Sequence, residues 1–121
     1  MVVGTDDTQE VDRLFGALSN ATRRDIVRRT LQAEYSVSQL ARCYSSSFAA
    51  VQKHVVVLER AGLVTKRAQG REQMVHGEPA AIATVHELLD QLEADWRDRL
   101  DRFENTLNHT TADETGEGEP T

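Results

Sequence analysis

Apolar residues recur every three or four positions through the first half of the chain, a spacing that predicts short amphipathic helices. A first helix is expected over residues 7–18. Asn20 is a good N-cap for a second helix. Ser36 and Gln39 have the spacing of a capping box, which predicts a short third helix.

A fourth helix is predicted after the serine-rich turn at residues 45–47. Ser47 is its expected N-cap, and Gly62 follows its expected end near Ala61 as a C-terminal stop. Its inward face is predicted to consist of Val51, Val55 and Leu58.

The pattern after Gly62 predicts two short strands, over residues 63–68 and 73–76, joined by a turn at Gln69 and Gly70. Gly70 suits a tight hairpin because glycine accepts positive φ. Short helices followed by such a hairpin predict a mainly α fold with a small β-hairpin wing, the layout of a winged helix-turn-helix.

The last helix is expected to be long and to follow Pro79, which suits the first turn of a helix. Its apolar residues form a narrow stripe on a heavily charged helix, which favours a seam for a second helix over a cover for its own core. The sequence therefore predicts a C-terminal dimerisation helix. The expected dimer contacts are Leu14 of the first helix and Leu89, Leu92, Trp96, Leu100 and Phe103 of the last helix.

The expected organisation is a flexible N-terminus over residues 1–8, a folded domain with its dimerisation helix over residues 9–108, and a disordered acidic tail over residues 109–121. Hydrophobic residues make up only 39% of the 121 residues, which favours a core completed by a second copy. No stretch has the length and apolarity of a membrane span, and no signal sequence opens the chain, so a cytoplasmic location is expected. Cys43 is the one cysteine and allows no internal disulfide.

The net charge of −6 is unevenly distributed. Residues 12–72 hold eleven Lys and Arg against five Asp and Glu, a net charge of +6, whereas the rest of the chain carries −12. A basic centre between acidic ends predicts one surface for phosphate. The alternative is that the basic centre is only a solvated surface.

The segment from Leu14 to Val27, LFGALSNATRRDIV, resembles the opening of ArsR-type winged-helix repressors. The resemblance continues through residues 36–41 and is strongest at residues 50–55 and 58–64. Four blocks in the same order span most of the expected folded part. The resemblance implies homodimers that bind double-stranded operator DNA and release it on a signal, here from an unidentified inducer.

The resemblance also marks a difference, because metal-sensing members carry a Cys-x-Cys pair at the start of the third helix. This chain has Ser36 and Ser38 there, or their neighbours Tyr35 and Val37, and none of these is a thiol. Soft-metal sites need three or four converging Cys or His ligands. We therefore expect no metal and no cofactor, as in the metal-independent branch of the family, and interpret His86 as an ordinary histidine.

A recognition helix enters the major groove with its N-terminal part. Gln can pair with adenine and Lys with guanine, and an apolar side chain can contact a thymine methyl group. Two of these base contacts have an alternative. Phe48 could instead be a hydrophobic staple that packs against the helix turn, and Lys53 could instead contact phosphate. Serines at the helix N-terminus favour a phosphate oxygen, and a basic wing favours backbone or minor-groove contacts. The predicted DNA contacts are Ser46, Ser47, Phe48, Ala49, Gln52, Lys53, Lys66, Arg67 and Arg71.

Two further basic positions have open assignments. Arg23 and Arg24 could contact phosphate or pair with acids of a neighbouring helix, and His54 is expected at the edge of the core rather than at a base.

No Gly-rich phosphate loop and no G-x-S-x-G motif is present, so no enzyme activity is expected. The predicted function is a homodimeric transcriptional regulator, most simply a repressor that binds an inverted repeat. The alternative is a winged-helix protein-interaction module without DNA binding.

Overall fold

The computed structural model describes the backbone of residues 2–118 and the side chains of residues 8–108. Met1 and residues 119–121 lie outside the described residues. The chain divides after Val85 into two compact units, each of which is considered by itself. Within the described part, no helix has the length and apolarity that crossing a membrane requires.

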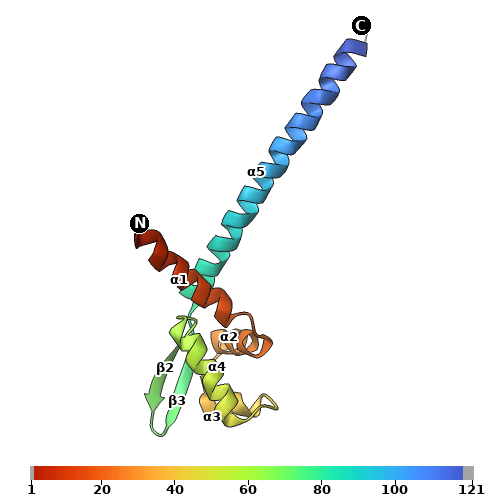
Figure 1. Ribbon diagram of the computed structural model, residues 1–121. Helices are drawn as coiled ribbons and strands as arrows, with labels where there is room; N and C mark the ends of the chain where they lie inside the picture. Colours follow the sequence, from red (N-terminus) through yellow and green to blue (C-terminus); the bar gives the residue numbers. More distant parts are fainter. Residues whose placement is uncertain (1, 119–121) are drawn as a thin grey trace. The chain divides into compact units, whose positions relative to one another are not determined.

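Four helices form most of the first unit (Figure 1): α1 (Val2–Ala17), α2 (Ala21–Gln32), α3 (Val37–Arg42) and α4 (Phe48–Arg60). The predicted caps are confirmed. The side chain of Asn20 accepts a hydrogen bond from the N–H of Arg23, and Ser47 accepts one from Ala50. Ser36 and Gln39 form a complete capping box at the start of α3.

The hairpin of the first unit consists of β2 (Val64–Gln69) and β3 (Glu72–Gly77), and β3 also pairs with a two-residue strand, β1 (Tyr35–Ser36). The sequence did not predict β1. It also placed the turn one residue too early, because Gln69 pairs with Glu72 and the turn residues are Gly70 and Arg71. Gly70 has φ 63° and no other residue has positive φ there, which is the pattern of a two-residue II′ turn.

One apolar core holds the first unit together. Its buried residues are Leu14, Ala17, Ile26, Val27, Val37, Leu40, Val51, Val55, Leu58, Leu63, Val64, Val75 and Val85. The predicted inward face of α4 is confirmed by three of them. Every element of the unit contributes to this core, β1 through the partly buried Tyr35, so the exposed face of α4 is presented by a rigid support.

Leu14 corrects one expected dimer contact. Its side chain is only 2% exposed and lies in the core of its own chain, so it offers almost no surface to a second copy. The neighbouring Phe15 is 37% exposed and is the large apolar side chain that this turn of α1 leaves accessible.

Gly77 at the end of β3 lies directly against α2. A Cβ atom at this position would come within 2.9 Å of the backbone nitrogen and two side-chain carbons of Leu31. Real Cβ atoms do not approach other atoms so closely, so only glycine allows β3 and α2 to be this near.

The last helix, α5 (Pro79–Gly118), begins in the first unit and continues through the second. Val85 packs in the core, whereas every residue from Leu89 to Asn108 is exposed. Both terminal helices are longer than predicted, since α1 begins before residue 7 and α5 continues past Leu107. Helical hydrogen bonding does not measure mobility, so flexibility of residues 1–8 and disorder of residues 109–121 stay predictions.

Candidate nucleic-acid interface

The first turns of α4 present the residues that the sequence predicted to reach DNA bases. Ala49, Gln52 and Lys53 are exposed, and they lie opposite the buried stripe of the same helix. Phe48 is 49% exposed, so packing accounts for only part of its surface. The structure therefore brings these four side chains together on one accessible face.

The serine-rich turn precedes this face. Ser45, Ser46 and Ser47 are all exposed, and the hydroxyl of Ser47 accepts the N–H of Ala50 at 3.1 Å. The first N–H groups of a helix have no partner within the helix and point toward its N-terminal end. They and the serine hydroxyls provide donors for an anionic oxygen beside the predicted base contacts.

The wing places its three basic residues in different situations. Lys66 lies 3.3 Å from the Glu59 carboxylate, and Arg67 donates hydrogen bonds of 2.8 and 3.0 Å to the two oxygens of Glu34. Arg71 occupies the turn and has no ion pair within residues 8–108. Exposed ion pairs contribute little stability, so phosphate can replace the carboxylate partners of Lys66 and Arg67. Arg71 is the wing cation that can bind phosphate without first leaving a carboxylate.

A polar cluster that the sequence did not reveal fixes the turn before α4. The Tyr44 hydroxyl donates to Asp25 at 2.6 Å, and the Arg29 Nε donates to the same carboxylate oxygen at 2.7 Å. Arg28 donates to the other oxygen, and the Arg29 guanidinium lies 5.8 Å from the centre of the Tyr44 ring. The helical spacing of Asp25 and Arg29 was visible in the sequence, whereas Tyr44 is nineteen positions away.

The charges in this cluster stabilise one another. Hydrogen bonds from Tyr44, Arg28 and Arg29 hold the pKa of Asp25 well below its usual range. Burial, together with the bond to the Asp25 carboxylate, raises the pKa of Tyr44. Asp25 is therefore ionised and Tyr44 neutral around pH 7, which is the state in which the bond between α2 and the α3–α4 turn is strongest.

Comparisons with known proteins agree with this geometry. No family model matches the chain. The chain is 36% identical over 80 residues to the HTH-type transcriptional regulator Rv2034 of Mycobacterium tuberculosis, an alignment that covers 66% of this chain and 75% of the relative. Its fold matches the ArsR-like transcriptional regulator from Rhodococcus sp. RHA1 with a TM-score of 0.74 and 30% identity, covering 84% and 95% of the two chains. The chain belongs to the ArsR family of winged helix-turn-helix transcriptional regulators.

Another ArsR-type structure is the homodimeric winged helix-turn-helix DNA-binding domain of Mb0332 from Mycobacterium bovis, a possible ArsR-family transcriptional regulator. It matches with a TM-score of 0.61 and 25% identity, and the match covers 75% of this chain and 83% of that domain. These relatives are transcriptional regulators, a class of proteins that is not enzymatic.

Metal-sensing members of the ArsR family carry a Cys-x-Cys pair at the start of the third helix. In this chain Ser36, at one of those positions, has a structural role. Ser36 is buried, and its N–H and hydroxyl are both engaged in the capping box with Gln39. Cys43 is exposed at the other end of α3. Among the described residues, no three His, Cys, Asp or Glu side chains converge as a metal site would require. The expectation that the protein uses no metal and no cofactor stays a prediction.

Arg23 and Arg24 pair with no acid among the described residues, so one of the two assignments that the sequence left open is wrong. Arg23 donates to the carbonyl oxygens of Ala17 at 2.7 Å and Gly16 at 3.1 Å, and Arg24 donates to that of Leu18 at 2.8 Å. These carbonyls lie at the C-terminal end of α1, where a helix leaves acceptors unpaired and favours positive charge. The two arginines therefore join α1 to α2. A contact of either arginine with phosphate stays a prediction.

His54 lies behind the exposed face of α4, as expected. It is half-buried, and its Nδ1 is 3.4 Å from Arg23 Nη1. Since arginine can only donate, Nδ1 is the acceptor. Burial and the nearby Arg23 charge both lower the pKa of His54, so the ring is mainly neutral around pH 7.

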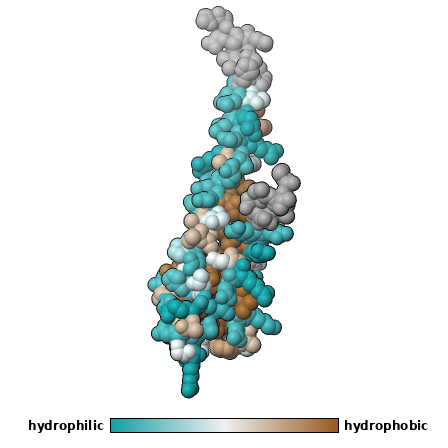
Figure 2. All heavy atoms as spheres, turned by 90° about the vertical axis from the view of Figure 1, so that its left-hand side faces the viewer, coloured by the Kyte–Doolittle hydropathy of each residue, from teal (hydrophilic) through white to brown (hydrophobic). Residues whose placement is uncertain are grey.

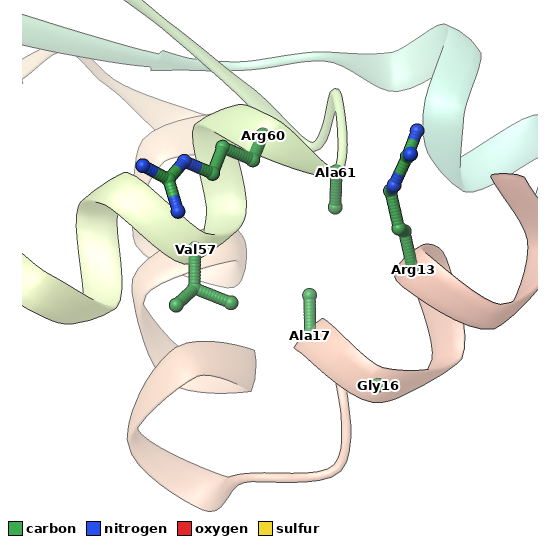
Figure 3. Close-up of a pocket in the computed structure, with 6 residues that line it drawn as sticks. All are labelled: Arg13, Gly16, Ala17, Val57, Arg60 and Ala61. Atoms are coloured by element: carbon green, nitrogen blue, oxygen red, sulfur yellow. The ribbon is translucent and has the colours of Figure 1, made fainter. Parts of the chain in front are cut away.

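A hollow of about 350 Å³ lies between α1 and the end of α4. Figure 3 shows Ala17, Val57 and Ala61 directed toward its centre, with Arg13 and Arg60 on opposite sides. Neither arginine has an ion pair among the side chains that the structure describes. The hollow thus combines an apolar floor with two cations, on a part of α4 distant from its N-terminal face.

Proposed function

We propose that the protein is a homodimeric repressor that binds an inverted repeat in operator DNA through the N-terminal part of α4. The observation that carries this proposal is the exposed face formed by Phe48, Ala49, Gln52 and Lys53. A helix that is buried along one stripe and exposed along the other can enter the major groove without unfolding any part of the core.

Each part of this surface has a distinct task in the proposed complex. Gln52 is suited to a two-fold hydrogen bond with adenine, and Lys53 to the O6 or N7 of guanine. Ser46 and Ser47 are suited to phosphate beside the helix N-terminus, and Arg71 to the backbone beyond the groove. Lys66 and Arg67 would exchange their carboxylate partners for phosphate.

The homodimer gives the proposed operator its symmetry. Two copies related by a two-fold axis place two α4 helices on one face of the duplex, so the half-sites must be inverted and spaced by about one helical turn, roughly 10 bp, or a multiple of it. Repression then follows from occupancy of a promoter. Release would be controlled by an inducer other than a metal ion.

A gel shift with the DNA upstream of the protein's own coding sequence tests the proposal. An inverted repeat in that DNA should be bound at nanomolar concentrations, and a scrambled sequence of the same length should be bound far more weakly. Equal affinity for both, or no binding to either at low salt, would favour the alternative of a winged-helix protein-interaction module.

A further inference from the structure

The hollow between α1 and the end of α4 has an apolar floor that water can reach. Val57 keeps 38% of its surface accessible, and Ala17 and Ala61 complete the floor. Figure 2 shows apolar patches exposed among the polar side chains of the chain. Small-molecule sites are mostly apolar concave surfaces of about 300–1,000 Å³. At about 350 Å³, this hollow is large enough for a small apolar ligand.

The hollow exists because the side chains where the two helices meet are small. Gly16 has no side chain, and Ala17 and Ala61 end at a methyl group. A Cβ atom at Gly16 would meet no neighbouring group within 4 Å. Packed cores leave few such spaces, because their side chains interdigitate. The contact of α1 with the end of α4 therefore leaves room that the chain itself does not fill.

Arg13 and Arg60 lie where this apolar hollow meets a polar one. Both arginines also line a second hollow of about 540 Å³, whose other lining residues include Gln9, Glu10 and Glu59. The remaining residues of the first hollow carry no charge. A ligand with an apolar body in the first hollow would thus have its polar end beside the two arginines.

The charges around the two hollows favour a ligand with a single negative charge. Glu59 lies 3.3 Å from Lys66, which is outside both hollows. With Lys66 included, the cations Arg13 and Arg60 exceed the acids Glu10 and Glu59 by one positive charge. One carboxylate would neutralise this excess, whereas a second would be repelled by the two glutamates.

The helix ends at the hollow do not oppose an anion. The last carbonyl groups of a helix have no partner within the helix and repel negative charge. Here Arg23 donates to the carbonyl oxygens of Gly16 and Ala17, and the N–H of Ala61 donates to that of Val57 at 3.1 Å. These acceptors are therefore already paired, and the free cations Arg13 and Arg60 dominate the local charge.

We propose that the hollow between α1 and α4 binds a small monocarboxylate with an alkyl or aryl body, and that this ligand is the inducer. The body covers the floor at Val57, and the carboxylate accepts hydrogen bonds from the guanidinium groups of Arg13 and Arg60, whose planar geometry suits a carboxylate. Binding of the ligand stands by itself, whereas its role as inducer rests on the proposed function.

The position of the hollow connects ligand binding to DNA binding. Val57 and Arg60 belong to the same helix as Gln52, which lies about 12 Å from Arg60 along the helix axis. A ligand held between α1 and α4 therefore changes the tilt of the face that carries Gln52. If it lowers operator affinity by some factor, operator DNA must lower the affinity for the ligand by the same factor.

A methyl NMR titration of the full chain tests the site with octanoate and phenylbutyrate as probes. Both should shift the methyl signals of Ala17, Val57 and Ala61. Octanol, which has the same alkyl body without the charge, should bind roughly tenfold more weakly or worse. Equal affinity for octanol and octanoate, or shifts confined to the exposed leucines Leu89 and Leu92, would overturn the site.

Variants in the hollow separate charge from space. Arg13→Gln and Arg60→Gln should each weaken octanoate binding by roughly fivefold, whereas Arg99→Gln, an exposed arginine of the second unit, should not change it. Gly16→Leu should block the hollow with both arginines intact, and Gly16→Ala is its control. Sedimentation of each variant completes the test. If Gly16→Leu raises the dimer dissociation constant and leaves octanoate binding unchanged, a second copy occupies the hollow and the ligand site is wrong.

Fluorescence anisotropy with operator DNA tests the role as inducer. Octanoate should lower the operator affinity of the native chain and of Gly16→Ala, but not that of Gly16→Leu. An operator affinity that octanoate leaves unchanged at saturation would overturn the role as inducer and retain the site. A chain that binds no operator would contradict the proposed function, and the NMR titration would still decide whether the site exists.

Discussion

The hydroxyl of Tyr44 donates a 2.6 Å hydrogen bond to the carboxylate of Asp25, which joins the α3–α4 turn to α2. Through this bond, a charged group on α2 holds the turn that precedes the proposed DNA-reading helix. Tyr44→Phe removes the hydroxyl and keeps the ring, and a hydrogen bond to a charged group contributes about 1.5–3 kcal/mol. We expect urea unfolding to show a loss at the lower end of that range. Ser45→Ala, at the exposed neighbouring position, is the control and should change stability by less than about 0.5 kcal/mol. If both variants unfold at the same urea concentration, the bond does not hold the turn.

The same cluster predicts how stability depends on pH. The pKa of Asp25 is lower in the folded chain than in the unfolded chain, so its contribution is complete above the unfolded pKa near 3.8. It is lost as the pH falls from there through the folded pKa. The difference in free energy of unfolding between the native chain and Asp25→Asn should therefore be constant from about pH 5 to 7 and shrink below pH 4. A difference that grows on acidification would contradict the lowered pKa.

The wing residues should differ in their effect on DNA binding. Arg71→Ala should weaken binding to all sequences about equally and reduce the salt slope by roughly 0.9, the value for one phosphate contact. Arg67→Ala should cost less, because Arg67 must first leave Glu34. Glu34→Gln is the informative partner variant, since it releases Arg67 and should strengthen nonspecific binding. Fluorescence anisotropy at three salt concentrations measures all three, and a change in sequence preference alone would assign Arg71 to the bases.

Gln52 should control specificity. A two-fold base contact provides about 1–3 kcal/mol of discrimination. Gln52→Ala should therefore weaken the operator complex by roughly 5- to 150-fold, while nonspecific DNA is held almost as before. Both DNAs must be compared at one salt concentration, because the phosphate contribution would otherwise hide the difference. An equal loss on both DNAs would mean that Gln52 only positions α4, and base reading would pass to Phe48 and Lys53.

Metal ions should leave operator affinity unchanged. Ser36 and Ser38 stand where metal-sensing members of the family carry their Cys-x-Cys pair, and Ser36 is already engaged in the capping box. Zinc, cadmium and arsenite, each added to the operator complex, should not release the DNA in a gel shift. Stoichiometric release by one of them would identify a metal sensor, and His86→Ala would then be the first variant to examine.

Local rules predicted the caps and the inward face of α4, because a cap needs only a side chain and a backbone N–H a few residues apart. They failed where the partner belongs to another element. Arg23 and Arg24 contact carbonyls at the end of the preceding helix, six or seven positions back, and Tyr44 reaches Asp25 across nineteen positions. Leu14 shows a further limit, since helical spacing marks an apolar side without saying whether its own core or a second copy covers it. The turn error at Gln69 arose because either neighbour of Gly70 could complete a two-residue loop.

Gly77 determines the angle between the β2–β3 wing and α2. The strand β3 rests on the backbone of Leu31 at one end and carries the turn with Arg71 at the other. A methyl group at position 77 would push this end of β3 away from α2, and because the strand is short and hydrogen-bonded to β2, the hairpin would rotate as one body. The absence of a side chain at Gly77, at the base of the hairpin, thereby determines how far Arg71 at its tip can reach.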